Sequence, residues 1–425
     1  MKEKKLFIIQ VNEVNFDLVE KYINKYHLPN LKKLISNFNL IETSSEKKYH
    51  NLEPWIQWVS FYTGKSADEH KIFHLNDTNK NMQTFYKEIE NSNKLLFMFP
   101  MNLKNNFNND TFFFPDPWTD TNQNTNSKLL NKFYEVAKKM ILQNQSIKLN
   151  FDAIINIILV FFKFTSLNGK LNLIKFGFLS IFKRYYKALF FDFLVSEISI
   201  KNINKSKTNI NTIFFNAAAH IQHHYLLSSE FYKKKYFDHS FIRNDDPIFE
   251  CYKVYDKIVG NFLNQKNTNY FFVTGLSQEP IVNPIYYWNL KSHENFFTNL
   301  KIPYKKIVKR MSRDYTLHFE NLNDLKKSIN ILKDVNLNKK KIFSIKEEEN
   351  KIYLELVYDD PIYNGENLYD GENNIISKNF FNDINFVAVK NSIHNEKGYV
   401  FTDLNFDEKK LNIKDFYNYF IKNYA

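Results

Sequence analysis

Three histidines lie within five residues of one another, at His220, His223 and His224, directly after an apolar run that ends at Asn216. Imidazole is a common metal ligand and the usual acid or base near neutral pH. Such a cluster can hold a cation or move a proton. It is equally compatible with a helix N-terminus whose imidazoles bond only to backbone or solvent, so the spacing by itself leaves both interpretations open.

Two other polar segments follow apolar, strand-like runs. Asn12 and Glu13 come after the run 6–11, and Ser277 and Gln278 come after the run 270–274. Amphipathic helical spacing lies between such runs, as at 16–23, 28–35, 55–64 and 246–264. This alternation predicts a mainly parallel sheet with helices on both faces, whose chemistry lies beyond the carboxyl ends of the strands.

The predicted fold class is α/β, a three-layer α/β/α sandwich with two insertions. The core is expected over 1–124, 209–304 and 366–425, a cationic aromatic helical insertion over 125–208, and a small β-α-β-β insertion over 305–365. In the small insertion the pattern predicts a strand at 315–319, a helix at 321–335 and a hairpin of 341–345 with 351–358. Residues 385–390 are expected to return to the core sheet.

Composition narrows the functional classes. The chain has 425 residues and only eight glycines, which excludes glycine-rich phosphate loops. The single cysteine, Cys251, excludes disulfides and thiolate metal clusters. Together with a short apolar start, it predicts a cytoplasmic protein. The net charge of +12 favours anionic partners. A nucleic-acid-binding protein is the least favoured class, because the cations are spread along the chain and no known binding module is present.

The segment 153–191 has no carboxylate and six Lys or Arg residues. Its aromatic residues at helical spacing favour a helical cap buried on the main sheet. The alternative is that these aromatic residues and cations lie on an anionic membrane surface, which would make the protein membrane-associated. The aromatic residues concerned are Phe176, Phe178, Phe182, Tyr185, Tyr186 and Phe190.

Five motifs together resemble a known family. They are Leu6–Leu34, Pro54–Lys65 with His70–Phe73, Phe214–Tyr225, Phe271–Ser277, and His394 with Gly398. Their order and spacing resemble the alkaline phosphatase superfamily, in particular its type I phosphodiesterase/nucleotide pyrophosphatase branch. The resemblance implies the sandwich fold, two cations held by Asp and His, and a Thr or Ser that attacks phosphorus or sulfur.

Matched residue by residue, this chain departs from the family's site. The first metal aspartate falls on Asn12, the nucleophile near Glu53 and Pro54, and the second aspartate on Ala219. The family's Asp-His pair falls within 275–278. His223 and His394 alone match metal ligands, so at most one divalent metal, zinc or manganese, is expected.

Three functions remain open. The first is a hydrolase or transferase with a remodelled site acting on a small anionic ester: a phosphodiester, a phosphomonoester or a sulfoester. The second is a catalytically degenerate homologue that binds a nucleotide, a sugar-phosphate or a lipid-linked glycan, and the third is a membrane-surface scaffold. The expected catalytic residues are Glu13, Glu53, His220 and Gln278; the expected substrate-binding residues are Asn12, Trp55, His224 and Ser277.

Overall fold

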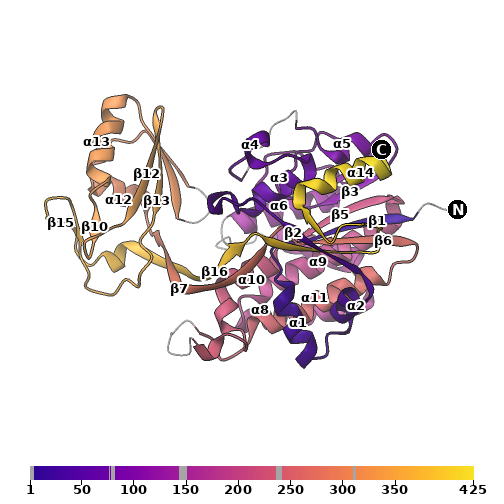
Figure 1. Cartoon of the computed structure of the whole chain (residues 1–425). Helices are drawn as coiled ribbons and strands as arrows, with labels where there is room; N and C mark the ends of the chain where they lie inside the picture. The colour runs from indigo at the N-terminus through magenta and orange to yellow at the C-terminus, as the bar shows by residue number, and fades with distance from the viewer. Residues whose placement is uncertain (1–3, 76, 78–81, 143–150, 236–241, 310–312) are drawn as a thin grey trace. The chain divides into compact units, whose positions relative to one another are not determined.

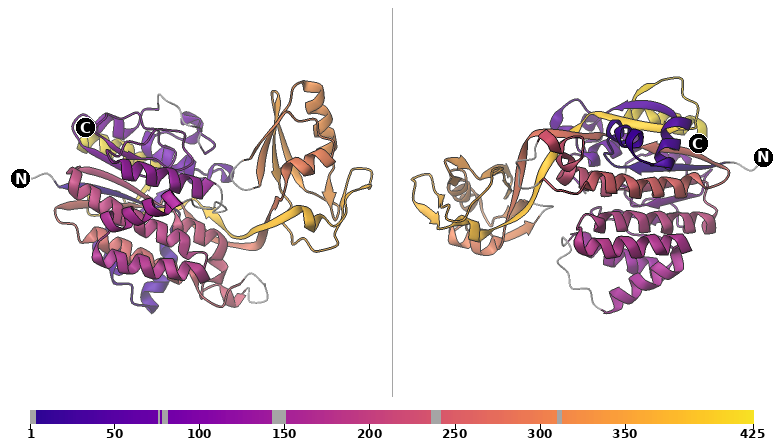
Figure 2. Two further views of the ribbon diagram at one scale, coloured as in Figure 1. Left: turned by 180° about the vertical axis from the view of Figure 1, so that it is seen from behind. Right: turned by 90° about the horizontal axis from the view of Figure 1, so that it is seen from below.

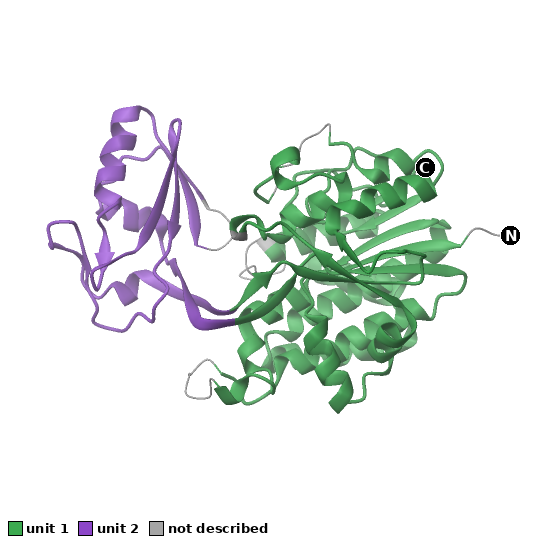
Figure 3. Ribbon diagram, in the orientation of Figure 1, with its two compact units in different colours: residues 1–280, 392–425 green, residues 281–391 purple. Residues whose placement is uncertain are grey.

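The computed structural model of the chain describes residues 4–75, 77, 82–142, 151–235, 242–309 and 313–425. The chain divides into two compact units (Figure 3). Unit 1 contains residues 1–280 and 392–425, and unit 2 contains residues 281–391.

Unit 1 is built on an eight-stranded sheet in the order β18-β2-β17-β6-β1-β5-β3-β4. Strand β17 is antiparallel to both of its neighbours, whereas the other adjacent pairs are parallel. The predicted α/β fold with a mainly parallel sheet is therefore confirmed. The strands are β1 (Lys5–Val11), β2 (Asn39–Ser44), β3 (Leu95–Met98), β4 (Phe112–Phe114), β5 (Ile210–Phe215), β6 (Thr268–Val273), β17 (Lys397–Thr402) and β18 (Lys410–Asn412).

Helices cover both faces of this sheet (Figure 1). One face carries α3 (Pro54–Thr63), α4 (Ala67–His70), α5 (Phe85–Ile89) and α14 (Phe416–Tyr424). The other carries α1 (Phe16–Lys25), α2 (Pro29–Asn37), α9 (Tyr186–Ser206), α10 (Ala217–Tyr225) and α11 (Pro247–Leu263). Three further helices are α6 (Lys128–Leu142), α7 (Phe151–Phe164) and α8 (Leu167–Phe182), of which α8 packs on α9 and α7 on α6.

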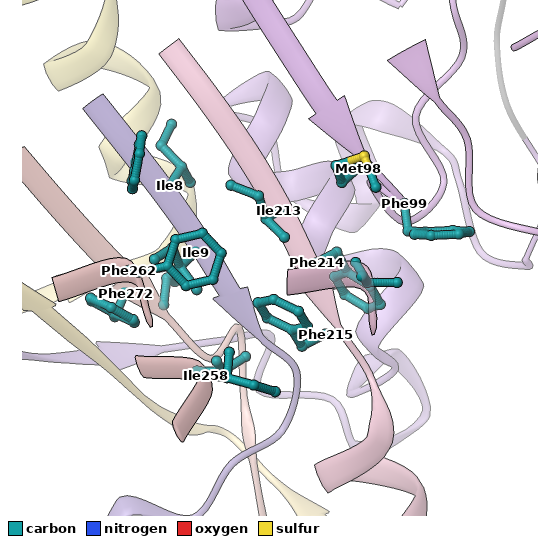
Figure 4. Packing of buried hydrophobic residues seen from close by; sticks show 14 of the residues in the cluster. Ile8, Ile9, Met98, Phe99, Ile213, Phe214, Phe215, Ile258, Phe262 and Phe272 are labelled. Carbon is teal, nitrogen blue, oxygen red and sulfur yellow. The ribbon is translucent and has the colours of Figure 1, made fainter. Parts of the chain in front are cut away.

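The core of unit 1 explains why the central strands are apolar throughout. Every residue of β5 is buried, and in β1 only Lys5 is not. Such strands are sandwiched between two helical layers and have no solvent-facing side. Figure 4 shows Ile9 beside Phe262 of α11 and Phe272 of β6, within the same buried cluster as Ile258. This packing fixes the level at which the central strands end.

The helices expected over 125–208 are α6 to α9, and they belong to unit 1. The six aromatic residues named for the membrane alternative are divided by the structure. Phe178 and Phe182 are exposed, but Phe176, Tyr185 and Tyr186 are buried and Phe190 is half-buried. The expectation of one shared surface for all six is therefore wrong, because Phe176 lies on the buried face of α8 and Tyr185 and Tyr186 are buried where α9 begins.

Unit 2 contains the predicted β-α-β-β order. Strand β9 (Asp314–His318) precedes α13 (Leu322–Leu332), and the hairpin follows as β12 (Phe343–Glu348) and β13 (Lys351–Leu356). As predicted, the Asn321 side chain caps α13 by accepting a hydrogen bond from Asp324 N at 2.9 Å. The remaining elements are α12 (His293–Asn299), β8 (Lys306–Lys309), β10 (Asn336–Leu337), β11 (Lys340–Lys341), β14 (Leu368–Tyr369) and β15 (Ile375–Ser377).

Two expectations about this region are corrected. The second unit spans 281–391 rather than 305–365, because α12 and Phe380 share its hydrophobic core. Residues 385–390 do not join the core sheet. They belong to β16 (Ile384–Asn395), which pairs with β7 (Ser277–Leu290) in a separate two-stranded sheet, and Phe386 and Val387 are exposed. The buried strand β17 takes the expected place in the core.

Candidate functional site

The carboxyl ends of β1, β5 and β6 meet at one point. Val11 pairs with Phe215 of β5, and Gln10 pairs with Val273 of β6. Beyond these pairs the backbone continues the contact: Asn12 N donates to the Phe215 carbonyl at 3.0 Å, and Glu13 N donates to the Thr274 carbonyl at 3.1 Å. The register therefore brings the first residues after all three strands together, as the sequence pattern predicts.

Glu13 adopts an unusual backbone conformation at this point, with φ of 60°. This left-handed region is costly for a residue with a side chain. Gln222 of α10 holds the turn in place, because its Nε2 donates to the Glu13 carbonyl at 2.6 Å and its Oε1 accepts from Asn15 N at 3.1 Å. The turn points the buried Glu13 carboxylate toward α10 and β16.

The Glu13 carboxylate faces two imidazoles. Its Oε2 lies 3.1 Å from His223 Nε2 and 3.2 Å from His394 Nε2, and the two Nε2 atoms are 3.3 Å apart. His223 comes from α10 and His394 from β16. Among the described residues, these three are the only group of His, Cys, Asp or Glu side chains close enough to ligate one cation.

The spacing of these three atoms fits a divalent cation. Zinc lies about 2.0–2.1 Å from nitrogen or oxygen ligands in a tetrahedral site, which places the ligand atoms about 3.3 Å from each other. The three observed separations, 3.1, 3.2 and 3.3 Å, are close to this value. Two histidines and one glutamate also form a known zinc-binding set.

A second row of polar side chains orients Glu13. Gln278 donates from Nε2 to Glu13 Oε2 and to the Ala219 carbonyl, and its Oε1 accepts from Ser392 Oγ at 2.6 Å. Burial by itself would raise the pKa of Glu13. The adjacent His394 and His223 outweigh burial and hold the pKa of this carboxyl well below its usual range. Glu13 is therefore an anion.

Asn12 is held by three hydrogen bonds within the protein, and its expected part in substrate binding stays a prediction. Its Nδ2 donates to Glu13 Oε1 at 3.0 Å and to Asn216 Oδ1 at 2.8 Å, while its Oδ1 accepts from Trp58 Nε1 at 2.9 Å. Both ends of the amide are thus used by the protein. Ala219, at the position of a second metal aspartate, offers only a methyl group, so the residues present do not fit the two-cation site of the family.

Glu53 stands at the start of α3, where the nucleophile of the resembled family falls. Its side chain makes no capping hydrogen bond to α3. Its Oε2 lies instead 3.7 Å from His394 Nδ1, on the side of the ring away from Glu13. The Glu53 carboxylate is about one-third exposed. It can therefore both attract the proton on His394 Nδ1 and reach solvent or substrate.

Four expected site residues lie outside the Glu13, His223 and His394 group, although His220 interacts electrostatically with His223. His220 and His224 lie one turn apart on α10, with ring centroids 4.8 Å from each other. His220 is exposed and Ser277 is buried. The Trp55 indole donates to the Phe73 carbonyl at 3.0 Å. Substrate binding by Trp55, His224 and Ser277 and catalysis by His220 stay predictions.

A second buried carboxylate holds the N-terminus of helix α10, the helix that carries His223. Asp192 of α9 accepts hydrogen bonds from Ala217 N at 2.8 Å and from the Tyr255 hydroxyl at 2.7 Å. Ala217 is the first residue of α10, so Asp192 satisfies an N–H that the helix cannot satisfy itself. Burial raises the pKa of Asp192 to about 6, since these hydrogen bonds lower it only in part.

Four supporting residues were not predicted as part of the site: Trp58, Asn216, Gln222 and Ser392. Asn216 and Gln222 lie next to the predicted histidine cluster, so their position was the available signal. The spacing of Trp58 in its helix predicts a core residue, and it gives no sign that the indole N–H donates to Asn12. Ser392 is an ordinary serine near His394, and nothing in the local pattern distinguishes it.

A family model and several solved structures are similar to this chain. The family model described as type I phosphodiesterase/nucleotide pyrophosphatase matches residues 6–275. Murine ectonucleotide pyrophosphatase/phosphodiesterase 5 is 9% identical, with 98% of this chain and 94% of that chain covered and a TM-score of 0.40. Phosphonoacetate hydrolase from Sinorhizobium meliloti is 9% identical, with 100% and 96% covered and a TM-score of 0.40. Alkaline phosphatase PafA is 11% identical, with 98% and 94% covered and a TM-score of 0.43. The comparison with curated proteins gives no match.

Proposed function

Because this chain belongs to the type I phosphodiesterase/nucleotide pyrophosphatase family, we propose that it hydrolyses a phosphate ester at a remodelled site with one divalent cation. Glu13, His223 and His394 would hold the cation, with zinc favoured by two imidazoles and one carboxylate. The observation that carries this proposal is the mutual spacing of their three ligand atoms. A cation there would supply Lewis-acid stabilisation of the negative charge on the phosphoryl oxygens.

The chain's own residues supply positioning and proton transfer. Gln278 and Asn12 donate hydrogen bonds to the Glu13 carboxylate and keep it facing the two imidazoles. Glu53 Oε2 lies 3.7 Å from His394 Nδ1, so its negative charge would favour a proton on Nδ1 and leave the lone pair of Nε2 to a cation once one binds. These contacts give the site its orientation before any ligand arrives.

Glu53 is the proposed general base. No hydroxyl side chain occupies the position of the family's nucleophile, so a covalent intermediate on Thr or Ser is not expected here. Glu53 would instead accept a proton from a water molecule whose oxygen attacks phosphorus, while the ester bond to the leaving oxygen breaks. The leaving oxygen would take its proton from solvent, because desolvation lowers the pKa of His220, the neighbouring imidazole on α10, to about 4 and leaves that ring neutral near pH 7.

Metal content and turnover test this proposal together. Purified protein is analysed for metals and assayed with bis(p-nitrophenyl) phosphate, p-nitrophenyl phosphate and p-nitrophenyl sulfate. The expected result is one equivalent of a divalent metal per chain and hydrolysis of a phosphate ester. His394→Ala should lose both, whereas His27→Ala, which removes an exposed histidine of the loop before α2, should lose neither. Two equivalents of metal, or turnover unchanged in His394→Ala, would contradict the proposal.

A degenerate binding protein is the second candidate, and one observation favours it. Hydrogen bonds within the protein already use both ends of the Asn12 amide and both ends of the Gln278 amide. Because these two amides already bond within the protein, they would shape a binding site without taking part in a reaction. Such a site can recognise a ligand without hydrolysing it. Metal bound at one equivalent, tight binding of a nucleotide and no hydrolysis of any of the three esters would favour this second function.

A further inference from the structure

The outer surface of α7 and α8 is unusually apolar. Of the 21 large apolar side chains that are exposed among the described residues, twelve lie within residues 151–182. Leu167 is 80% exposed and Ile181 is 73% exposed. We name these twelve residues the α7–α8 surface: Phe151, Ile154, Ile155, Ile158, Leu159, Phe162, Leu167, Leu171, Ile174, Phe178, Ile181 and Phe182.

This surface is one continuous face of each helix. The opposite faces are buried against unit 1, at Ala153, Asn156, Val160 and Phe164 in α7 and at Gly169, Leu173 and Phe176 in α8. Both sets recur every three or four residues, as the two faces of an amphipathic helix do. Figure 2 shows these magenta helices at the periphery of unit 1 in its right-hand view. Each helix already buries one face against the rest of unit 1. The exposed apolar face is therefore a second face, and the helix does not need it for packing in the core.

The charges around this surface are mostly positive, and its one exposed carboxylate is Asp152, next to Phe151 at the start of α7. The exposed positions from 154 to 182 hold, besides the apolar residues, only two lysines, a serine and an asparagine. The lysines are Lys163 and Lys175, and no carboxylate of the described residues forms an ion pair with either of them. Lys170 lies 5.6 Å from the centre of the Phe162 ring, which places a third cation beside the apolar face.

We infer that the α7–α8 surface docks onto an anionic lipid bilayer. Apolar side chains bordered by lysines, with Asp152 at the start of α7 as the one exposed acid, match an interface of acyl chains below and anionic headgroups above. A protein partner is less favoured than a bilayer, because protein–protein interfaces are depleted in lysine relative to the rest of the protein surface.

The dimensions favour lying on the bilayer over crossing it. Helices of 14 and 16 residues are about 21 and 24 Å long, shorter than the roughly 30 Å of the hydrocarbon core. None of the helices that the structure describes combines the length and the apolar character needed to cross a membrane. This inference does not depend on the proposed hydrolase activity.

Vesicle flotation of the full chain tests the inference. The probes are vesicles of phosphatidylcholine alone and vesicles with about 30% phosphatidylglycerol, at low salt and in 0.5 M NaCl. We expect most of the protein to float with the anionic vesicles at low salt, little with phosphatidylcholine alone, and at least about tenfold weaker binding in high salt because surface charges are screened. Equal binding to both vesicle types, or binding to neither, would overturn the inference.

Matched variants identify the surface. The double variant Ile174→Glu, Phe178→Glu should abolish flotation. The control Val282→Glu, Ile375→Glu introduces the same charges at exposed apolar positions of unit 2 and should float like the unaltered protein. Lys163→Gln with Lys175→Gln should weaken binding by about 25-fold, at about fivefold for each lysine. Unfolding curves confirm that each variant folds. If light scattering shows a dimer that Ile174→Glu, Phe178→Glu dissociates while flotation is absent, the occupant is a second copy and the inference is wrong.

Discussion

Two buried carboxylates lie on either side of α10, and they differ in their electrical surroundings. Glu13 faces two imidazoles, and its pKa is held well below the usual range. Asp192 is equally buried but faces neutral donors, the backbone N–H groups of Ala217 and Asn216 and the Tyr255 hydroxyl, and burial raises its pKa to about 6. Hydrogen bonds from neutral donors therefore do not compensate for burial here, whereas two nearby imidazoles do. The comparison separates a carboxylate suited to ligate a cation from one that supports a helix.

The largest expected effect comes from removing the charge of Glu13. Glu13→Gln keeps the size of the side chain but removes the anion between His223 and His394. We expect the affinity for a divalent cation to fall by more than about 100-fold, measured by titration with a chromophoric chelator. Asp192→Asn should leave the affinity unchanged. A similar loss in both variants would erase the distinction between the two carboxylates.

Asp192→Ala should mainly destabilise the fold. The substitution leaves Ala217 N and the Tyr255 hydroxyl buried without their acceptor, which costs about 1–3 kcal/mol for each group. We expect the free energy of unfolding at pH 5 to fall by about 3 kcal/mol in urea titrations. Tyr255→Phe removes one of the two hydrogen bonds and should have a smaller effect. A loss below 1 kcal/mol in Asp192→Ala would show that α10 does not depend on this contact.

The stability conferred by Asp192 should depend on pH. Its pKa rises from 3.8 in the unfolded chain to about 6 in the fold, so the unfolded chain releases this proton first as pH increases. The contribution is complete below pH 4 and is lost between pH 4 and pH 6, by about 2–3 kcal/mol. The difference in unfolding free energy between the unaltered protein and Asp192→Asn should therefore shift across this window. A constant difference would contradict the raised pKa.

The smallest effect is expected at Ser392. Its hydroxyl donates to Gln278 Oε1 and so fixes which end of the amide faces Glu13. Ser392→Ala should lower metal affinity by about tenfold and leave global stability within about 1 kcal/mol. Ser45→Ala removes another buried hydroxyl, which donates to the Gly275 carbonyl, and should not change the affinity. Equal metal affinity in both variants would assign Ser392 to packing alone.

The sequence predicted the mainly parallel sheet and placed Glu13 and His223 at its carboxyl edge, because strand ends follow from apolar patterning. His394 was expected as a metal ligand from the family resemblance alone. The family match over residues 6–275 confirms the resemblance drawn from motif order. The place of β16 was not predictable. An apolar run such as 385–390 has the same residue pattern whether its strand joins a core sheet or a two-stranded sheet.

Long-range hydrogen bonds were equally hidden from the sequence. Asn12 was predicted to bind substrate, but its amide contacts Trp58 and Asn216, which lie 46 and 204 residues away along the chain. No local pattern reports such partners. The division of the aromatic residues between the core and the α7–α8 surface depended in the same way on which faces of α8 and α9 pack against the rest of unit 1.

The left-handed backbone of Glu13 lowers the stability of the fold, whereas its carboxylate is needed in the candidate site. Glycine adopts this conformation without a steric penalty, and a side chain there costs of order 1 kcal/mol or more. A population of this protein selected in the laboratory only for folding would consequently drift toward glycine at residue 13. Retention of glutamate under selection in the cell would then measure how much the organism needs what that carboxylate does.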